Sequence, residues 1–320
     1  MTVTLRVPAS TSNLGSGFDC VGMAVDRWLT VTGRVVPGGG AVSLERSGTL
    51  GALAPEPDAD LVVRGFVAAC RAAGRQAPGG LVLRADSEIP VGRGLGASAA
   101  AIVAGAAVAR ALLGLPLDDA ALIDVAAQLE GHPDNVAPAV RGGATLSVPR
   151  PGGGGYHVES LEVHPSLAFV FAVPPLEFAV TTERARAVLP AELPHAVAVT
   201  SAARAAALVI GLARGDRALL AAGLDDALHV PYRRVLVPGY DDVTAAAVRA
   251  GAWGATLSGS GSSILAVASR DAATTVADAM RSAWHKAGVA ADAFSVTGRT
   301  GGCALVPGPA SATLTSSPEV

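Results

Sequence analysis

The chain has 320 residues, of which 50% are hydrophobic and 16% charged, and its formal net charge is −3. This composition excludes a disordered chain and is sufficient for one large hydrophobic core or two moderate ones. The small negative charge offers nothing that would attract nucleic acid or an anionic membrane, so we expect a small-molecule partner, no nucleic acid and no membrane.

Strand patterns dominate the first part of the chain. They are expected at residues 2–7, 28–36, 41–45 and 81–85, which are rich in β-branched residues or alternate between polar and apolar ones. One helix interrupts them at about residues 60–73 and ends at Gly74, a residue type that favours helix C-caps. Two further helices are predicted at residues 98–113 and 118–130, and an extended segment, GGATLSV, follows them.

The second part of the chain again alternates strands and helices. PGGGG at residues 151–155 is predicted to be a hairpin loop near a domain boundary. After it come a strand in LAFVFAVP, Ala-rich helices, a strand pair in WGATLSGSGSSILAVAS, a helix at about residues 271–287 and a strand in AFSVTG. This order predicts a split βαβ sandwich with helices on one face of an antiparallel sheet. We expect domains at residues 1–165 and 166–302, and a disordered tail rich in Pro, Ser and Thr at residues 303–320.

Three features of the sequence indicate the cellular compartment: the N-terminal residues, the length of the apolar runs and the spacing of the cysteines. MTVTLRVPAS alternates like a strand and lacks the apolar core of a secretory signal. The longest apolar run considered, residues 97–109, is stopped by Arg110 well short of the roughly 20 residues that a membrane span needs. Cys20, Cys70 and Cys303 form no CxxC pair. We therefore expect a cytoplasmic protein with reduced thiols and without a transmembrane helix.

A glycine-rich loop, PVGRGLGASAAA at residues 90–101, directly precedes the helix predicted from Ser98. Backbone N–H groups at a helix N-terminus bind anions, because the first turn has unsatisfied donors and the macrodipole adds about half a positive charge. Glycines let a phosphate approach that backbone, and Ser98 adds a hydroxyl for phosphate or metal. The loop therefore predicts a phosphate site, and the residues alone leave open a turn that merely admits close helix packing.

Two other phosphate loops do not fit this chain. A Walker A loop needs GxxxxGK[ST], whereas the single lysine, Lys286, lies far from the loop. Residues 92–97 do satisfy the GxGxxA pattern of dinucleotide folds. That fold, however, requires a following strand that ends in an acidic residue about 20 positions on, and here a second helix follows the first.

The loop and three further blocks carry a family resemblance. PVGRGLGASAA resembles the ATP-binding loop of the GHMP kinase superfamily, usually written PxxxGLGSSAA. VPASTSNLGSGFDCVGMAVD, EGHPDNVAPAVRGG and HVPYRRVLVPG resemble, in order, the blocks of homoserine kinases, and with GATLSGSGSSILAV the similarity extends over about residues 2–300. The resemblance implies an α+β GHMP kinase fold, with an N-terminal ribosomal-S5-like domain, a C-terminal ferredoxin-like α/β sandwich and an active site between them.

The resemblance also implies a reaction. Homoserine kinases transfer the γ-phosphoryl group of ATP, with Mg²⁺, to the side-chain hydroxyl of L-homoserine, a step toward threonine. The family's metal ligands correspond to Ser98 and Glu130, and one hydroxyl with one carboxylate suits Mg²⁺. From the residues alone, Glu130 would be an ordinary charge at a helix end. The implied ATP loop consists of Pro90, Val91, Gly92, Arg93, Gly94, Leu95, Gly96, Ala97, Ser98, Ala99 and Ala100.

A zwitterionic substrate needs cations for its carboxylate and oxygen acceptors for its ammonium. Arg186 and Arg233 match two family arginines that hold the carboxylate. The residues that match the rest of the family's substrate pocket are Asn13 and Asp19, at the hydroxyl and amino end, and His132 and Asn135 of EGHPDN. Without the resemblance, solvated arginines and turn-capping Asn and Asp side chains would be the ordinary interpretation. Relatives commonly form homodimers, and we expect one here.

The chain departs from the family pattern at several positions. No general base emerges, since the place of an aspartate–lysine pair in some relatives corresponds to Thr182; our hypothesis is that the hydroxyl loses its proton late, toward phosphate or through Thr182. Ala97 replaces the first serine of the loop, which leaves the backbone donors. The other substitutions are Ser262 for a proline, Val230 for a glutamate and Asp60 for an asparagine beside the adenine, so the base contacts stay open.

Two alternatives remain at this stage. One is a GHMP kinase for another small alcohol such as mevalonate, pantoate or a sugar, although a sugar has no use for the arginine pair. The other is a non-catalytic sensor of ATP or an amino acid on the same fold, which would not need the metal pair Ser98 and Glu130.

Overall fold

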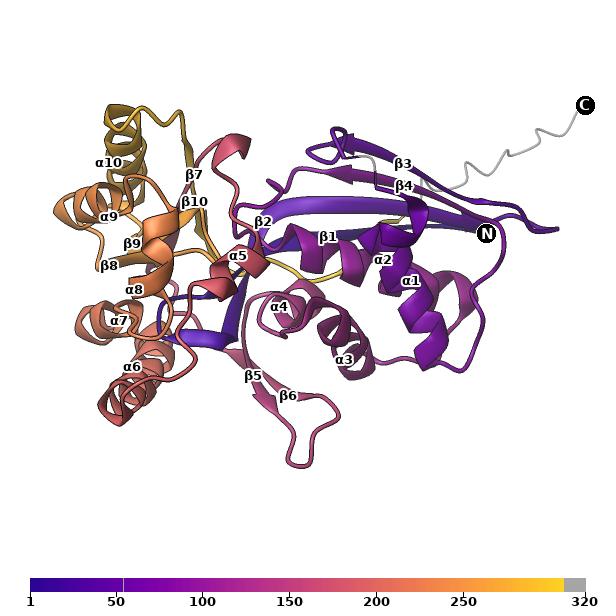
Figure 1. Ribbon diagram of the computed structural model, residues 1–320, viewed down its shortest axis with the longest axis horizontal. Helices are drawn as coiled ribbons and strands as arrows, with labels where there is room; N and C mark the ends of the chain where they lie inside the picture. Colours follow the sequence, from indigo (N-terminus) through magenta and orange to yellow (C-terminus); the bar gives the residue numbers. More distant parts are fainter. Residues whose placement is uncertain (54, 308–320) are drawn as a thin grey trace, which may run out of the picture.

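The structure is a computed structural model that describes residues 1–53 and 55–307 (Figure 1). Within these residues it contains a seven-stranded sheet in the order β11-β1-β2-β4-β3, with β5 paired to β2 and β6 to β5, and a four-stranded sheet in the order β10-β7-β9-β8. The strands of the first sheet are β1 (Thr2–Asn13), β2 (Gly17–Val35), β3 (Val42–Gly48), β4 (Leu81–Ser87), β5 (Ala144–Pro149), β6 (Tyr156–Leu161) and β11 (Ala304–Leu305).

A long hairpin of β1 and β2 runs through the first half and reaches the second (Figure 1). Its pairing extends from Thr2 opposite Arg34 to Asn13 opposite Gly17, with irregularities after Pro8 and Ser12. The predicted strands at residues 2–7 and 28–36 are therefore only the outer parts of two longer strands. The hairpin brings its tip, residues 13–17, to the junction of the two halves.

Four helices cover one face of the first sheet: α1 (Leu61–Ala72), α2 (Ala97–Leu113), α3 (Asp119–Glu130) and α4 (Val136–Arg141). α1 and α2 pack closely because glycines lie at their contact. A Cβ at Gly65 would lie 2.1 Å from the Ile102 carbonyl oxygen, and a Cβ at Gly105 would lie 1.9 Å from that of Val62. This close packing buries α2 almost completely, which explains its Ala-rich composition.

The second half contains β7 (Leu167–Val173), β8 (Gly254–Leu257), β9 (Ile264–Ser269) and β10 (Asp292–Thr297), all paired antiparallel. Its helices are α5 (Thr182–Ala187), α6 (His195–Arg214), α7 (Arg217–Leu224), α8 (Val230–Arg233), α9 (Tyr240–Arg249) and α10 (Ala273–Lys286). Single 3-10 turns lie at η1 (Pro57–Ala59), η2 (Leu176–Phe178) and η3 (Arg234–Leu236). The strand order, with one helical connection on each side of the β8–β9 pair, confirms the predicted α+β class and the ferredoxin-like second sheet.

Both faces of this second sheet are covered, which corrects the expectation of helices on one face. Val170 and its alternate neighbours along β7 pack with α9 and α10 in a separate core cluster. Phe169 and Phe171 point to the other face, where they join the main core together with Leu212 of α6 and Leu220 of α7. β7 is therefore buried at every position, and the two halves share one core on this side.

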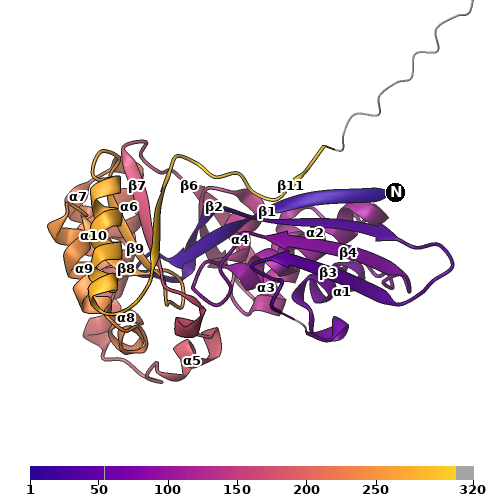
Figure 2. The ribbon, with the colours of Figure 1, turned by 90° about the horizontal axis from the view of Figure 1, so that it is seen from above.

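The end of the described chain returns to the first sheet. Residues 304–305 form β11 beside β1, with Leu305 opposite Leu5, and the Val306 N–H donates to the Thr4 carbonyl oxygen at 2.9 Å. Figure 2 shows this segment running back from the second half along β1. The predicted disordered tail at residues 303–320 is thus wrong for residues 303–307, and the remainder of that prediction, residues 308–320, lies outside the described residues.

One helix of the described chain, α6, is long and apolar enough to cross a membrane, with a mean hydropathy of 1.8 over its most apolar window. Residues 97–109, the longest apolar run considered from the sequence, belong instead to the shorter helix α2. A single such helix is weak evidence for a transmembrane segment, because a helix in the core of a soluble protein can have the same length and composition. α6 packs against α7 through Leu208, whose backbone lies next to Gly223.

Candidate active site

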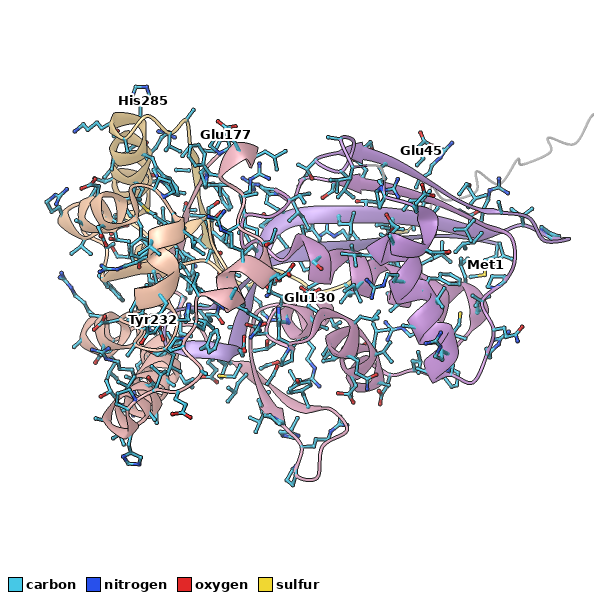
Figure 3. The ribbon with its side chains drawn as sticks, in the orientation of Figure 1. Met1, Glu45, Glu130, Glu177, Tyr232 and His285 are labelled. Atoms are coloured by element: carbon cyan, nitrogen blue, oxygen red, sulfur yellow. The ribbon has the colours of Figure 1, made fainter. Side chains whose placement is uncertain are left out.

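A cavity of about 540 Å³ lies where the two halves meet. One end is mainly apolar and is lined by Leu44, Leu50, Leu53, Leu61 and Val62, together with Arg46 and Asp60. The glycine loop lines the middle. The other end is strongly polar and is lined by Asp19, Glu130, His132, Asp134, Arg186 and Arg233. Figure 3 shows Glu130, at the end of α3, near the junction of the two halves.

The glycine loop turns its carbonyl oxygens toward the protein and leaves its N–H groups free. The carbonyls of residues 92–95 accept hydrogen bonds, in order, from the Val180 N–H at 3.1 Å, the Ser263 N–H at 3.3 Å, the Ser258 hydroxyl at 2.7 Å and the Ser10 N–H at 3.1 Å. Among the described residues, the N–H groups of residues 91–98 have no protein acceptor. Seven of these residues, all except Arg93, line the cavity, and their N–H groups at the start of a buried helix form a site for a polyanion such as a nucleotide phosphate chain.

Only glycine fits at two positions of this loop. Gly94 and Gly96 have φ values of +67° and +68°, in the left-handed region. A Cβ at Gly94 would lie 1.9 Å from the Ser258 carbonyl oxygen, and one at Gly96 would lie 2.1 Å from the Ser10 hydroxyl. The glycines are therefore required for the contact between the loop and its two neighbouring segments, as well as for access to the backbone.

Ser98 and Glu130 are in direct contact. The Ser98 hydroxyl donates to the Glu130 Oε2 at 2.6 Å, which brings the first turn of α2 to the last residue of α3. Burial raises the pKa of Glu130, and the hydrogen bond from Ser98 partly opposes this. The two oxygens are hard donors of the kind that Mg²⁺ prefers. The described residues contain no group of three or more His, Cys, Asp or Glu side chains placed to hold a metal ion, so phosphate oxygens and water would have to complete such a site.

His132 follows Glu130 and pairs with Asp134. Its Nδ1 lies 2.6 Å from the Asp134 Oδ1, and both side chains are buried. Burial lowers the pKa of His132, but the hydrogen bond and charge of Asp134, with the charges of Glu130 and Asp19, outweigh burial and raise the pKa overall. The cationic form is therefore favoured more than in a free histidine, and its partner is Asp134, a carboxylate that was not among the predicted site residues.

The two predicted asparagines line the cavity, but their amides bind protein groups. Asn135 accepts from the Ser10 hydroxyl and donates to the Ser12 hydroxyl, both at 2.9 Å. Asn13, with φ +71°, donates to the Gly259 carbonyl oxygen at 3.0 Å and accepts from the Asp19 N–H at 3.0 Å. These contacts connect β1 to the neighbouring segments and hold the walls of the site.

Arg186 and Asp19 form a two-point ion pair across the junction. The Arg186 Nη1 and Nη2 donate to the two Asp19 carboxylate oxygens at 3.1 and 2.9 Å. The side chains keep 40% and 38% of their exposure, so solvent reaches the pair. An exposed pair of this kind contributes about 0–1 kcal/mol and opens readily.

Arg233 lies deeper, with only 2% exposure. Its Nε donates to the Ala185 carbonyl oxygen at 3.0 Å, and its guanidinium lies 5.0 Å from the centre of the Phe18 ring. The Phe18 ring in turn stacks on His229 at 4.9 Å. Phe18 and His229 were not predicted from the sequence; the aromatic residue next to Asp19, and the histidine four positions before Arg233, were the signals available.

The remaining predicted residues divide into two groups. Thr182, the first residue of α5, lines the cavity, as do Val91 and most of the loop. Pro90, Arg93, Ala99 and Ala100 do not line it. Arg93 donates to the Val91 and Pro174 carbonyl oxygens, and Ala99 and Ala100 are fully buried in the core. Asp60 caps α1 and pairs with Arg46 at 2.7 Å.

A polyanion site at a helix start, a hydroxyl–carboxylate pair beside it and a cationic pocket at its far end are the parts of an ATP-dependent small-molecule kinase. Family models for the GHMP kinases N-terminal domain and the GHMP kinases C-terminal domain match residues 60–143 and 208–286. Homoserine kinase of Gloeobacter violaceus is 42% identical over 294 residues, which cover 88% of this chain and 93% of that protein. Homoserine kinase of Trichormus variabilis is 39% identical, with coverages of 91% and 94%.

Solved structures agree with these relatives. Homoserine kinase from Cytophaga hutchinsonii superposes with a TM-score of 0.85 at 30% identity, covering 95% of this chain and 97% of that one. Mevalonate kinase of L. major shares the fold, with a TM-score of 0.68 at 17% identity, covering 91% of this chain and 95% of that one. The chain belongs to the GHMP kinases and, within them, to the homoserine kinase family.

Proposed function

We propose that this protein phosphorylates the side-chain hydroxyl of L-homoserine with ATP to give O-phospho-L-homoserine. The observation that carries the proposal is the polar end of the cavity, where Arg186, Arg233 and Asp19 lie beside the glycine loop. Two cations and one carboxylate complement the carboxylate and the ammonium of an amino acid. The family of the chain supports the same substrate.

The Asp19–Arg186 pair suggests how the substrate enters. A zwitterion replaces both partners at once, because its carboxylate takes Arg186 while its ammonium takes Asp19. Neither charge is then left unpaired, which avoids the large penalty of an isolated charge in a closing site. Arg233, already oriented by the Ala185 carbonyl, provides the second cation for the carboxylate.

The glycine loop would bind the phosphate chain of ATP through the free N–H groups of residues 91–98. Ser98 and Glu130 would hold Mg²⁺, and their oxygen donors fit that ion. When bound, the metal would neutralise negative charge on the phosphate oxygens. The apolar end of the cavity, lined by leucines, would take the adenine.

The chain positions the two reactants rather than attacking the phosphate itself. We propose that the loop donors stabilise the transferring phosphoryl group and that the substrate hydroxyl loses its proton late, toward a phosphate oxygen or through Thr182. A cationic His132, held by Asp134, would add positive charge at this end of the cavity. Thr182→Ala tests the threonine: nearly full turnover would exclude a role for its hydroxyl.

The deciding experiment is an ADP-release assay with Mg²⁺ and ATP on L-homoserine, L-serine, mevalonate, pantoate and galactose. Glu130→Ala and Arg233→Ala would be assayed beside two matched controls, Glu159→Ala on β6 and Arg234→Ala, whose side chains are solvent-exposed. A selective response to homoserine that only the first two variants lose supports the proposal. Turnover of another alcohol keeps the kinase and replaces the substrate, and ATP binding without turnover favours a sensor.

The proposal also covers the oligomeric state, the cellular compartment and the biosynthetic role of the protein. We propose a homodimer in the cytoplasm that acts in threonine biosynthesis. The three cysteines are free thiols, with Cys70 buried, which is compatible with a reducing compartment. Sedimentation of the purified protein would test the dimer directly.

A further inference from the structure

A fully buried histidine lies behind the substrate pocket without touching the cavity. His229 precedes α8 and has 0% exposure. Its Nε2 lies 3.1 Å from the Gly15 carbonyl oxygen, in the loop that ends β1, and its Nδ1 lies 3.4 Å from the Arg233 Nη1. The imidazole therefore contacts two segments that are more than 200 residues apart along the chain.

These two contacts define the protonation of the ring. The Gly15 carbonyl can only accept, so the Nε2 must carry the hydrogen. The Arg233 guanidinium can only donate, so the Nδ1 must be an unprotonated acceptor. Burial lowers the pKa of His229; the nearby Asp226 carboxylate opposes burial and the Arg233 charge reinforces it. The contacts with Gly15 and Arg233 both fit the neutral tautomer with hydrogen on Nε2, and the Asp226 Oδ2 faces the same nitrogen at 3.7 Å.

Two neighbours keep the imidazole in place. The Phe18 ring stacks on it, with 19° between the ring planes, and the same phenyl ring lies under the Arg233 guanidinium. The Asp226 Oδ2 accepts from the His229 N–H at 2.6 Å and from the Val230 N–H at 2.8 Å, which fixes the backbone at the start of α8. Contacts therefore hold His229 at both its side chain and its main chain.

We infer that His229 is a positioning residue for Arg233. The neutral imidazole joins the guanidinium to the Gly15 loop, which leads directly into the start of β2 with Asp19, and so sets the distance between the group that receives the substrate carboxylate and the group that receives its ammonium. This inference rests on the proposed function, because that function assigns Arg233 to the carboxylate.

The test compares His229→Asn with His229→Leu, whose side chains have the same number of heavy atoms and the same branching. Asn places an acceptor close to the position of the Nδ1, and Leu has none. We expect the Leu variant to raise KM for homoserine roughly 10- to 100-fold, the effect of losing a hydrogen bond to a charged group, with KM for ATP within about twofold of wild type. The Asn variant should recover most of the loss. Thermal unfolding checks that both variants fold.

Equal KM values for homoserine in the two variants would overturn the inference, and so would equal increases in the KM values for ATP and for homoserine. In either case, lost packing alone would explain the change in KM.

A second measurement does not depend on turnover. In ¹⁵N NMR of the substrate-free protein, the His229 signals, assigned by their loss in the Asn variant, should show a protonated Nε2 and an unprotonated Nδ1. A cationic ring or hydrogen on Nδ1 would overturn it. If the wild-type protein does not phosphorylate homoserine, the proposed function is wrong. The NMR measurement still tests whether His229 has the protonation that the inference requires.

Discussion

Asp19 and Arg186, predicted to bind opposite ends of one substrate, bind each other through two hydrogen bonds of 2.9 and 3.1 Å. Both come from segments that meet only in the folded protein, the hairpin of β1 and β2 and the short helix α5. The pair shows that their charges are complementary before a ligand arrives.

Arg186→Gln should therefore weaken substrate binding far more than folding. We expect kcat/KM for homoserine to fall at least about tenfold, since a charge-assisted contact is lost, while the free energy of unfolding changes by less than about 1 kcal/mol because the pair is exposed. Steady-state kinetics and urea titration measure the two effects. Arg184→Gln on the same helix is the matched control, since its side chain is exposed. Equal kinetics in both variants would contradict the assignment.

Gly94→Ala should abolish ATP binding and destabilise the fold. The added Cβ would lie 1.9 Å from the Ser258 carbonyl oxygen, so either the loop or the strand connection must move. Gly74→Ala is the control, because Gly74 has a similar φ of +68° with nothing within 4 Å of the added Cβ. The control should lose about 1 kcal/mol from backbone strain alone. Calorimetric titration with ATP and thermal unfolding would show whether the two glycines differ as expected.

Glu130→Gln should stabilise the protein at neutral pH while abolishing turnover. Burial raises the pKa of this carboxyl above its ordinary value of 4.5, so the ionised form is disfavoured in the folded state. The stability it contributes is therefore complete below pH 4.5 and is lost as pH rises through the raised pKa. The Tm advantage of the Gln variant should appear above that window and vanish below it. A constant advantage across pH 4 to 8 would contradict this account.

Two serines of the β8–β9 connection should respond in opposite directions to alanine. The Ser263 hydroxyl is buried without a partner among the described residues, so Ser263→Ala should be neutral or stabilising by up to about 1 kcal/mol. The Ser258 hydroxyl donates to the Gly94 carbonyl oxygen at 2.7 Å and lies 2.9 Å from that of Thr11, so Ser258→Ala should destabilise by about 1 kcal/mol. Denaturant unfolding of the pair measures the contrast, and the same sign in both would refute it.

The sequence could predict those parts of the site that are formed by residues close together along the chain. The glycine loop and the helix after it were predictable because glycine spacing and the start of an apolar helix occupy one short stretch. The partners of Asn13 and Asn135 were not, because their amides meet Gly259, Ser10 and Ser12 only after the halves assemble. The return of the last segment to β1 was hidden for the same reason: a two-residue strand among Pro, Ser and Thr has no periodicity to detect.

β11 has a mechanical consequence. The chain crosses from the first half to the second at residues 162–166 and comes back at residues 298–303, so two separate connections run between the sheets. The tip of the β1–β2 hairpin adds a third attachment, through the Asn13 contact with Gly259. A single protease cut in one crossing would therefore leave the fragments associated. We expect any opening of the cavity to bend the two halves about both crossings together, because neither half can move away without them.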